Sequence, residues 1–136
     1  MMSFLIFPQI VLADVIVPLS TVTFPLIPFV ILIETIVFWL MANNLMKYRV
    51  GFWKSLLVVA IANLATSLLG TIIPLYKYAI GNLIWIGIAF TLSVFIEWAI
   101  YLPFFRKTKI KKSDLLKISL AGNFITYAIL AALQLF

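Results

Sequence analysis

The sequence predicts an all-α integral membrane protein with four transmembrane helices, arranged as two tandem, parallel-repeat helical hairpins after a Pro-broken N-terminal segment. Three observations favour this fold class. Of the 136 residues, 65% are hydrophobic and 10% are charged, whereas soluble domains are about half apolar and a quarter charged. The mean hydropathy is +1.23. The apolar residues lie in four long runs, and sparse polar residues recur at matching places in two pairs of these runs.

The four apolar runs have the length that a transmembrane helix requires. A bilayer core of about 30 Å needs roughly 20 helical residues. We expect spans at residues 28–46, 55–75, 79–103 and 114–136. Pro28 suits the first turn of its helix, and aromatic and basic residues flank the second span as they do at headgroup boundaries. The resulting organisation is an N-terminal segment, a first hairpin and a second hairpin at residues 1–27, 28–75 and 76–136.

The N-terminal segment allows two interpretations. Residues 4–13 resemble the core of a signal peptide, and Ala13 before Asp14 resembles a cleavage site, but no Lys or Arg precedes this core. If the segment is retained, prolines at positions 8, 18, 25 and 28 break any continuous spanning helix. An interfacial segment on the outer face is then expected. Both interpretations place the N-terminus outside.

Basic residues are concentrated in two of the three connections between spans. Short cytoplasmic loops keep an excess of Lys and Arg, so we expect these two loops to be cytoplasmic and both termini to lie outside. The net charge of +6 then reflects topology and contact with lipid headgroups, without a nucleic-acid partner. The residues assigned to this role are Lys47, Arg49, Lys54, Arg106, Lys107, Lys109, Lys111 and Lys112.

An internal repeat relates the two hairpins. Residues 33–38 align with 96–101 at an offset of 63, and residues 62–66 align with 122–126 at an offset of 60. Each half has a Glu in its first helix, then a basic turn, then Asn-x-x-Thr in its second helix. Such residues are sparse in hydrocarbon, so their recurrence in order favours a parallel repeat about an axis along the membrane normal. A chance similarity between two apolar hairpins is the alternative.

The repeated polar residues predict two sites inside the membrane. Counting 1.5 Å per residue from the basic loops places Glu34 at roughly 19 Å and Glu97 at roughly 14 Å depth. An acid at the centre of a spanning helix costs about 2.5 to 3.5 kcal/mol, so it faces the bundle and finds a partner or stays protonated. We expect each Glu to bond to the Asn and Thr of the next helix, which are Asn63 and Thr66 in the first hairpin and Asn123 and Thr126 in the second.

Small residues recur at every fourth position of the second and fourth spans. This spacing allows two helix backbones to approach closely in a membrane. Besides the two threonines, the residues assigned to helix packing are Ala62, Gly70, Gly122, Ala128 and Ala132. The second and fourth helices are therefore expected to be central, with both Glu side chains turned toward them.

The chain contains no His and no Cys, which removes the commonest general base, the thiolate nucleophile and the usual zinc and iron ligands. We expect no enzyme activity, no cofactor and no metal. The expected function is that of a small accessory, assembly or interaction subunit of a membrane complex, or of a homo-oligomer, with the bilayer and other membrane helices as partners. The alternative is a proton- or cation-coupled transporter or channel that uses Glu34 and Glu97.

Overall fold

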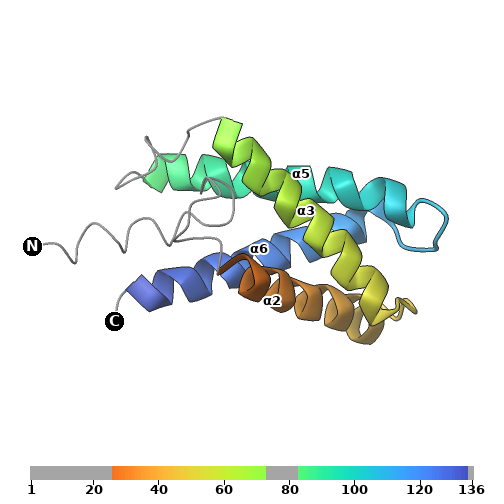
Figure 1. Cartoon of the computed structure of the whole chain (residues 1–136). Helices are drawn as coiled ribbons and strands as arrows, with labels where there is room; N and C mark the ends of the chain where they lie inside the picture. Colours follow the sequence, from red (N-terminus) through yellow and green to blue (C-terminus); the bar gives the residue numbers. More distant parts are fainter. Residues whose placement is uncertain (1–25, 73–82, 135–136) are drawn as a thin grey trace, which may run out of the picture.

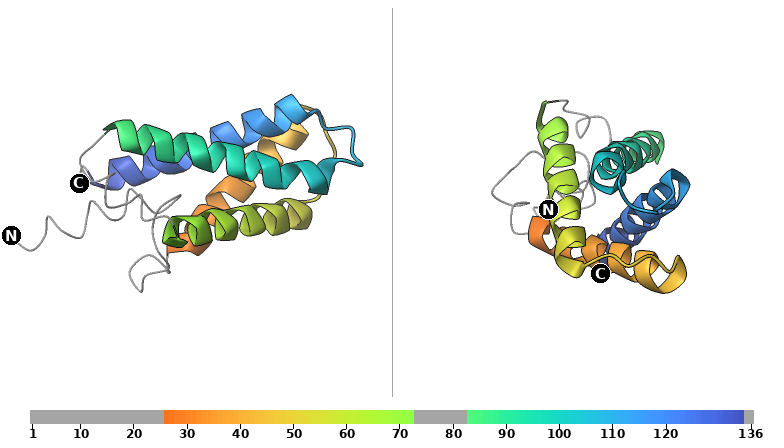
Figure 2. Two further views of the ribbon diagram at one scale, coloured as in Figure 1. Left: turned by 90° about the horizontal axis from the view of Figure 1, so that it is seen from above. Right: turned by 90° about the vertical axis from the view of Figure 1, so that its right-hand side faces the viewer.

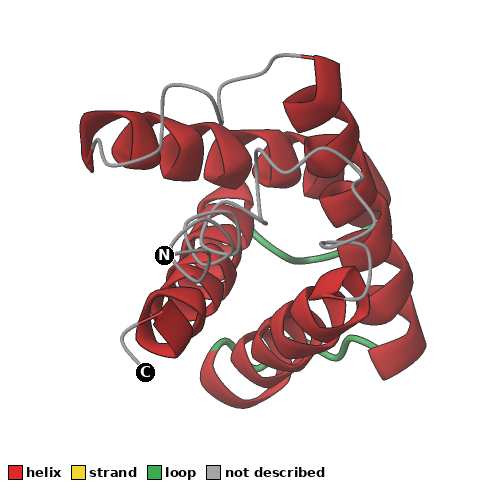
Figure 3. Cartoon of the chain, turned by 60° about the vertical axis from the view of Figure 1, so that its left-hand side comes forward, coloured by secondary structure: helices red, strands yellow, loops and turns green. Residues whose placement is uncertain are grey.

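The structure is a computed structural model that describes residues 26–72 and 83–134. None of these residues lies in a strand (Figure 3). The helices are α2 (Ile27–Leu40), the π-helical turn η2 (Met41–Leu45), α3 (Phe52–Ile72), α5 (Leu83–Phe105) and α6 (Lys112–Gln134). The expected signal-like or interfacial segment lies outside the described residues, except for its last two positions.

Three of the described helices are long and apolar enough to cross a membrane, over Ile27–Leu45, Phe52–Gly70 and Ile86–Phe105. They correspond to the first three expected spans. The fourth expected span corresponds to α6, which has 23 residues. Its first two turns carry Lys112, Asp114 and Lys117, so its apolar part begins deeper in the helix.

The four α-helices form a ring in which each has two principal neighbours. Helix α2 packs against α3 and α6, and α5 packs against the same two helices (Figure 2). The connections 46–51 and 106–111 lie at one end of the bundle, on the right in Figure 1. Contrary to expectation, α3 and α6 are not central. The reason is that α2 and α5 also carry buried faces, which meet across the ring through Phe38, Tyr101 and Phe105.

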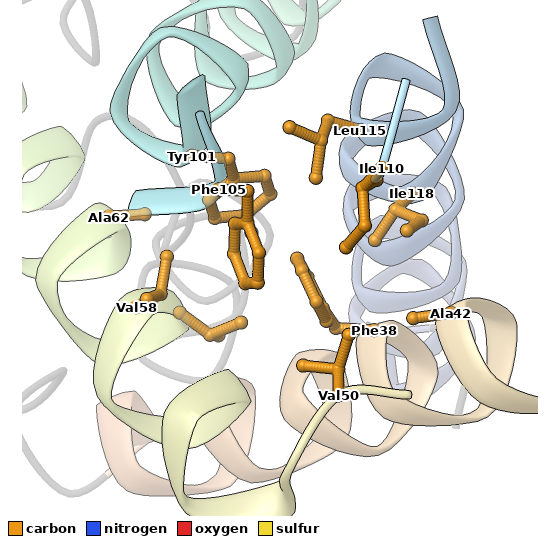
Figure 4. Packing of buried hydrophobic residues seen from close by; sticks show 11 residues of the cluster. Phe38, Ala42, Val50, Val58, Ala62, Tyr101, Phe105, Ile110, Leu115 and Ile118 are labelled. Atoms are coloured by element: carbon orange, nitrogen blue, oxygen red, sulfur yellow. The ribbon is translucent and has the colours of Figure 1, made fainter. Parts of the chain in front are cut away.

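The apolar core occupies the end of the bundle where the connections 46–51 and 106–111 lie. The ring of Phe38 meets Tyr101 edge-on at 5.2 Å and stacks on Phe105 at 5.3 Å (Figure 4). Smaller aliphatic residues from η2, α3, α6 and the two connections fill the space around these aromatic rings, namely Ala42, Val50, Val58, Val59, Ala62, Ile110, Leu115 and Ile118. Many large apolar side chains point outward instead, among them Phe29, Leu45, Trp53, Ile84 and Phe124. An apolar exterior of this kind suits a bilayer as solvent.

The first connection is held by side-chain bonds. Asn43 in η2 accepts from the backbone N–H of Val50 at 3.0 Å and donates to its carbonyl at 3.0 Å. Lys47 adopts a left-handed conformation with φ of 60°, which is common just after a helix end. The hydroxyl of Tyr48 donates to Asp114 at 2.8 Å. The first connection is thereby joined to the start of α6.

Candidate functional site

The carboxyl of Glu34 lies between three helices. This α2 side chain is 2% exposed. Its Oε2 accepts a hydrogen bond from Asn63 Nδ2 of α3 at 2.7 Å, and its Oε1 accepts one from Thr126 Oγ1 of α6 at 3.1 Å. Both principal neighbours of α2 therefore hold the same carboxyl. We call these three residues the Glu34 cluster.

The carboxyl of Glu97 is held chiefly by α6. This α5 side chain is 1% exposed. Its Oε2 accepts from Asn123 Nδ2 at 2.7 Å and from Ser119 Oγ at 3.2 Å. The hydroxyl of Tyr101, one turn along α5, lies 3.4 Å from the same oxygen and donates to it. We call these four residues the Glu97 cluster.

The two asparagines have the same local geometry. Asn63 Nδ2 also donates to the carbonyl of Val59 at 3.1 Å, and Asn123 Nδ2 also donates to that of Ser119 at 3.0 Å. Each amide thus uses one hydrogen on its own helix, four residues back, and the other on a buried glutamate. This arrangement fixes the amide and presents the same donor to each carboxyl.

The threonines do not pair as expected. Thr126 bonds to the glutamate of the other hairpin, while the hydroxyl of Thr66 donates to the carbonyl of Asn63 at 2.9 Å. The arrangement of the four helices explains the partner of Thr126. Residues three apart on a helix differ by about 60° around its axis, and α6 has α5 on one side and α2 on the other. Asn123 therefore faces α5, while Thr126 faces α2.

The small residues assigned to packing fall into two groups. Ala62, Gly70 and Gly122 are buried, and a methyl group built on Gly122 would lie 3.7 Å from Cγ of Glu34. This close approach brings α6 within reach of the Glu34 carboxyl. By contrast, Ala128 and Ala132 are exposed, so they lie on the outer surface of the single chain.

The basic residues expected at the headgroup boundary lie together at one end of the bundle. All are exposed, and they occupy the two connections and the first turns of α3 and α6. Asp114 forms an ion pair with Lys117 at 3.3 Å. The hydrogen bond from Tyr48 is the largest influence that holds the pKa of Asp114 below its ordinary value, and the same bond raises the pKa of Tyr48.

Several residues of these sites were not expected. Ser119 lies one turn before Asn123, and Tyr101 lies one turn after Glu97. Spacing of four residues on a helix was the available signal, because it places side chains on one face. Asn43 and Tyr48 show no comparable pattern. Their partners, Val50 and Asp114, come within reach only because of how the folded chain runs through the first connection and back at α6.

The chemistry of the clusters is that of carboxyl, amide and hydroxyl groups. They can hold a proton or bind through oxygen atoms. Within the described residues no group of three His, Cys, Asp or Glu is placed to hold a metal ion. No family model matches the chain, and neither a curated protein nor a solved structure matches it. Fold and site define a small, all-helical protein with helices fit for a membrane and two buried carboxyl clusters.

Proposed function

We propose that the protein is a non-catalytic, multi-pass membrane protein that serves as an accessory or interaction subunit, and that its buried carboxyls hold its helices together. The observation that carries this proposal is the enclosure of both glutamates, each 2.7 Å from the amide of an asparagine on the next helix. A buried acid without such donors would be costly in hydrocarbon. Polar contacts between membrane helices contribute about 0.6 kcal/mol each on average.

We further propose that α6 is a fourth span and that the hairpins are tandem repeats. Support comes from burial at equivalent positions. The pairs Glu34 and Glu97, Asn63 and Asn123, Val58 and Ile118, and Phe38 and Tyr101 are all buried. A two-fold axis through the centre of the bundle, along the direction of the helices, would exchange α2 with α5 and α3 with α6. This exchange agrees with the observed neighbours. With both basic connections at one end, the positive-inside rule places that end in the cytoplasm.

Two features favour a structural role for the carboxyls over a transport path within one chain. The stacked aromatic side chains of Phe38 and Phe105, with Tyr101 edge-on, fill the space between the four helices at the end of the bundle where the basic connections lie (Figure 4). In addition, neither glutamate lines any of three cavities defined by the described residues. The connections 46–51 and 106–111 are also short, so among the described residues the outer faces of the helices offer most of the surface for partners.

Transport of protons or cations is the second candidate function, and one observation favours it. Asn123 Oδ1 and Ser93 Oγ are buried and have no hydrogen-bond partner among the described residues. Ser93 lies one turn before Glu97 on α5, and Asn123 bonds to Glu97 directly. Buried polar atoms of this kind are often completed by a water molecule or an ion. A carrier that uses Glu97 would need such atoms beside it.

The first test is extraction of the protein from its native membrane in a mild detergent, followed by measurement of the mass and composition of the particle. The accessory role predicts a stable assembly with other membrane subunits. A homo-oligomer without companions would contradict that role.

The second test separates the two functions with Glu34→Gln and Glu97→Gln, which keep the side-chain shape but remove the titratable proton. The accessory role predicts unchanged abundance and assembly for both variants. The transport role predicts that proton or cation flux into vesicles disappears while the protein stays folded. Asp114→Asn is the matched control, because it removes an acid at the basic end of the bundle.

A further inference from the structure

A cavity opens between the two basic connections. Its volume is about 380 Å³, which lies in the lower part of the range of small-molecule sites, roughly 300–1,000 Å³. Four cationic side chains line it, from the first connection, from α3 and from the second connection. They are Lys47, Arg49, Lys54 and Lys109. None of the described residues that line this cavity is acidic.

Neighbouring groups leave the positive charge of the cavity uncancelled. Asp114 lies near the same two connections, but its carboxylate accepts from Tyr48 at 2.8 Å and pairs with Lys117 at 3.3 Å. The ammonium of Lys54 lies 4.8 Å from the centre of the Phe105 ring. This cation–π contact holds the charge at the cavity without neutralising it.

The backbone adds to the attraction for an anion. Helix α3 begins at Phe52, directly after Gly51, and both Gly51 and Lys54 line the cavity. The first turn of this 21-residue helix therefore lies at the cavity wall, and its free amides favour negative charge. A methyl group built on Gly51 would meet nothing within 4 Å. The space beside the Gly51 backbone is therefore open.

We propose that this cavity binds a phosphate group, and that the phosphate belongs to the headgroup of an anionic phospholipid. The assignment to a lipid rests on the membrane insertion proposed above. The cavity lies at the end of the bundle where a headgroup layer would meet the chain, and its lining includes the apolar Val50, Phe105 and Ile110. Trp53, which directly precedes the lining residue Lys54 and is 78% exposed, suits the boundary between headgroups and acyl chains.

The test uses the full-length protein in nanodiscs of phosphatidylcholine doped with phosphatidic acid. Native mass spectrometry after release into detergent measures the lipid that stays bound. We expect one phosphatidic acid to be retained in preference to phosphatidylcholine. Lys54→Gln and Lys109→Gln should each weaken retention about fivefold, the effect of one cation near an anionic surface. Lys109 is exposed in the second connection, so its variant remains informative if Lys54→Gln fails to fold.

Lys107→Gln is the matched control, since it removes the same charge from an exposed residue outside the cavity lining. Equal loss of lipid in Lys107→Gln and Lys54→Gln would overturn the proposal, because general surface charge would then explain binding. Equal retention of phosphatidylcholine would also overturn it.

The last experiment offers inorganic phosphate alone, without an anionic lipid. If it binds the protein in phosphatidylcholine nanodiscs as tightly as phosphatidic acid does, the lipid source is wrong. The composition of the native assembly tests the accessory role separately.

Discussion

Thr126 donates a hydrogen bond of 3.1 Å to Glu34, 92 residues earlier in the chain. Glu34 also accepts from Asn63 of its own hairpin at 2.7 Å. One carboxyl therefore joins the two hairpins and the two helices of the first. In the ring of four helices, this contact closes the junction between α2 and α6, which no short connection links.

Loss of the Thr126 hydroxyl should loosen that junction. Thr126→Val keeps the side-chain volume but removes the donor to Glu34, so we expect a loss of about 0.6 kcal/mol, and at most about 2 kcal/mol, of unfolding free energy. Reversible unfolding in detergent micelles measures the change.

Thr91→Val is the control for this substitution. Thr91 is exposed on α5, and its hydroxyl donates only to the carbonyl of Gly87, four residues back. The bond of Thr126 to Gly122 has the same form, so the control subtracts this local contribution. Equal effects of the two variants would contradict the role assigned to the contact with Glu34.

The bond between Tyr48 and Asp114 should make stability depend on pH. Because this bond holds the pKa of Asp114 below its ordinary 3.8, its contribution is present above about pH 4 and is lost as pH falls through the pKa of the folded state. The pKa of Tyr48 is raised above 10.0 by the same bond, so the contribution is also lost as pH rises through that raised pKa.

Comparison of the wild type with Tyr48→Phe measures this effect. We expect a higher Tm for the wild type at pH 7, and a Tm difference that shrinks as pH falls below 3.8. Tyr127→Phe, whose ring contacts Phe90 and lies 13 residues beyond Asp114 on α6, should keep the acid dependence of the wild type. A Tm difference for Tyr48→Phe that stays constant from pH 7 to pH 2 would show that Asp114 does not carry the effect.

Asn43 should control the order of the first connection. Asn43→Ala removes two bonds to Val50 and one to Trp39, and we expect a loss of about 2 kcal/mol, since each bond contributes roughly 0.5 to 1.5 kcal/mol. Cleavage by trypsin after Lys47 and Arg49 should become faster.

Asn44→Ala provides the matched control, because Asn44 is adjacent but exposed. Exposed positions change stability by less than about 0.5 kcal/mol. If both variants are cleaved at the rate of the wild type, the bonds of Asn43 do not hold the connection.

Local properties of the chain could be predicted from the sequence. Long apolar runs bounded by charges predicted helices at residues 28–46, 55–75 and 79–103, and over the described part of these runs the structure places α2 with η2, α3 and α5. The pairing of Glu34 with Asn63, and of Glu97 with Asn123, also followed. Both depend on depth along neighbouring antiparallel helices, which counting residues from a shared turn estimates well.

The arrangement of helices around the ring was decided by tertiary structure alone. Counting gives the depth of a residue but not the direction in which its helix face points, so Thr126 was assigned to Glu97 although it bonds to Glu34. The same limit applies to the cavity of Lys54 and Lys109, which belong to turns 55 residues apart (109 − 54). Hydropathy and spacing describe each helix along its own axis. Which faces meet depends on side-chain packing among four helices at once, and only the folded chain defines it.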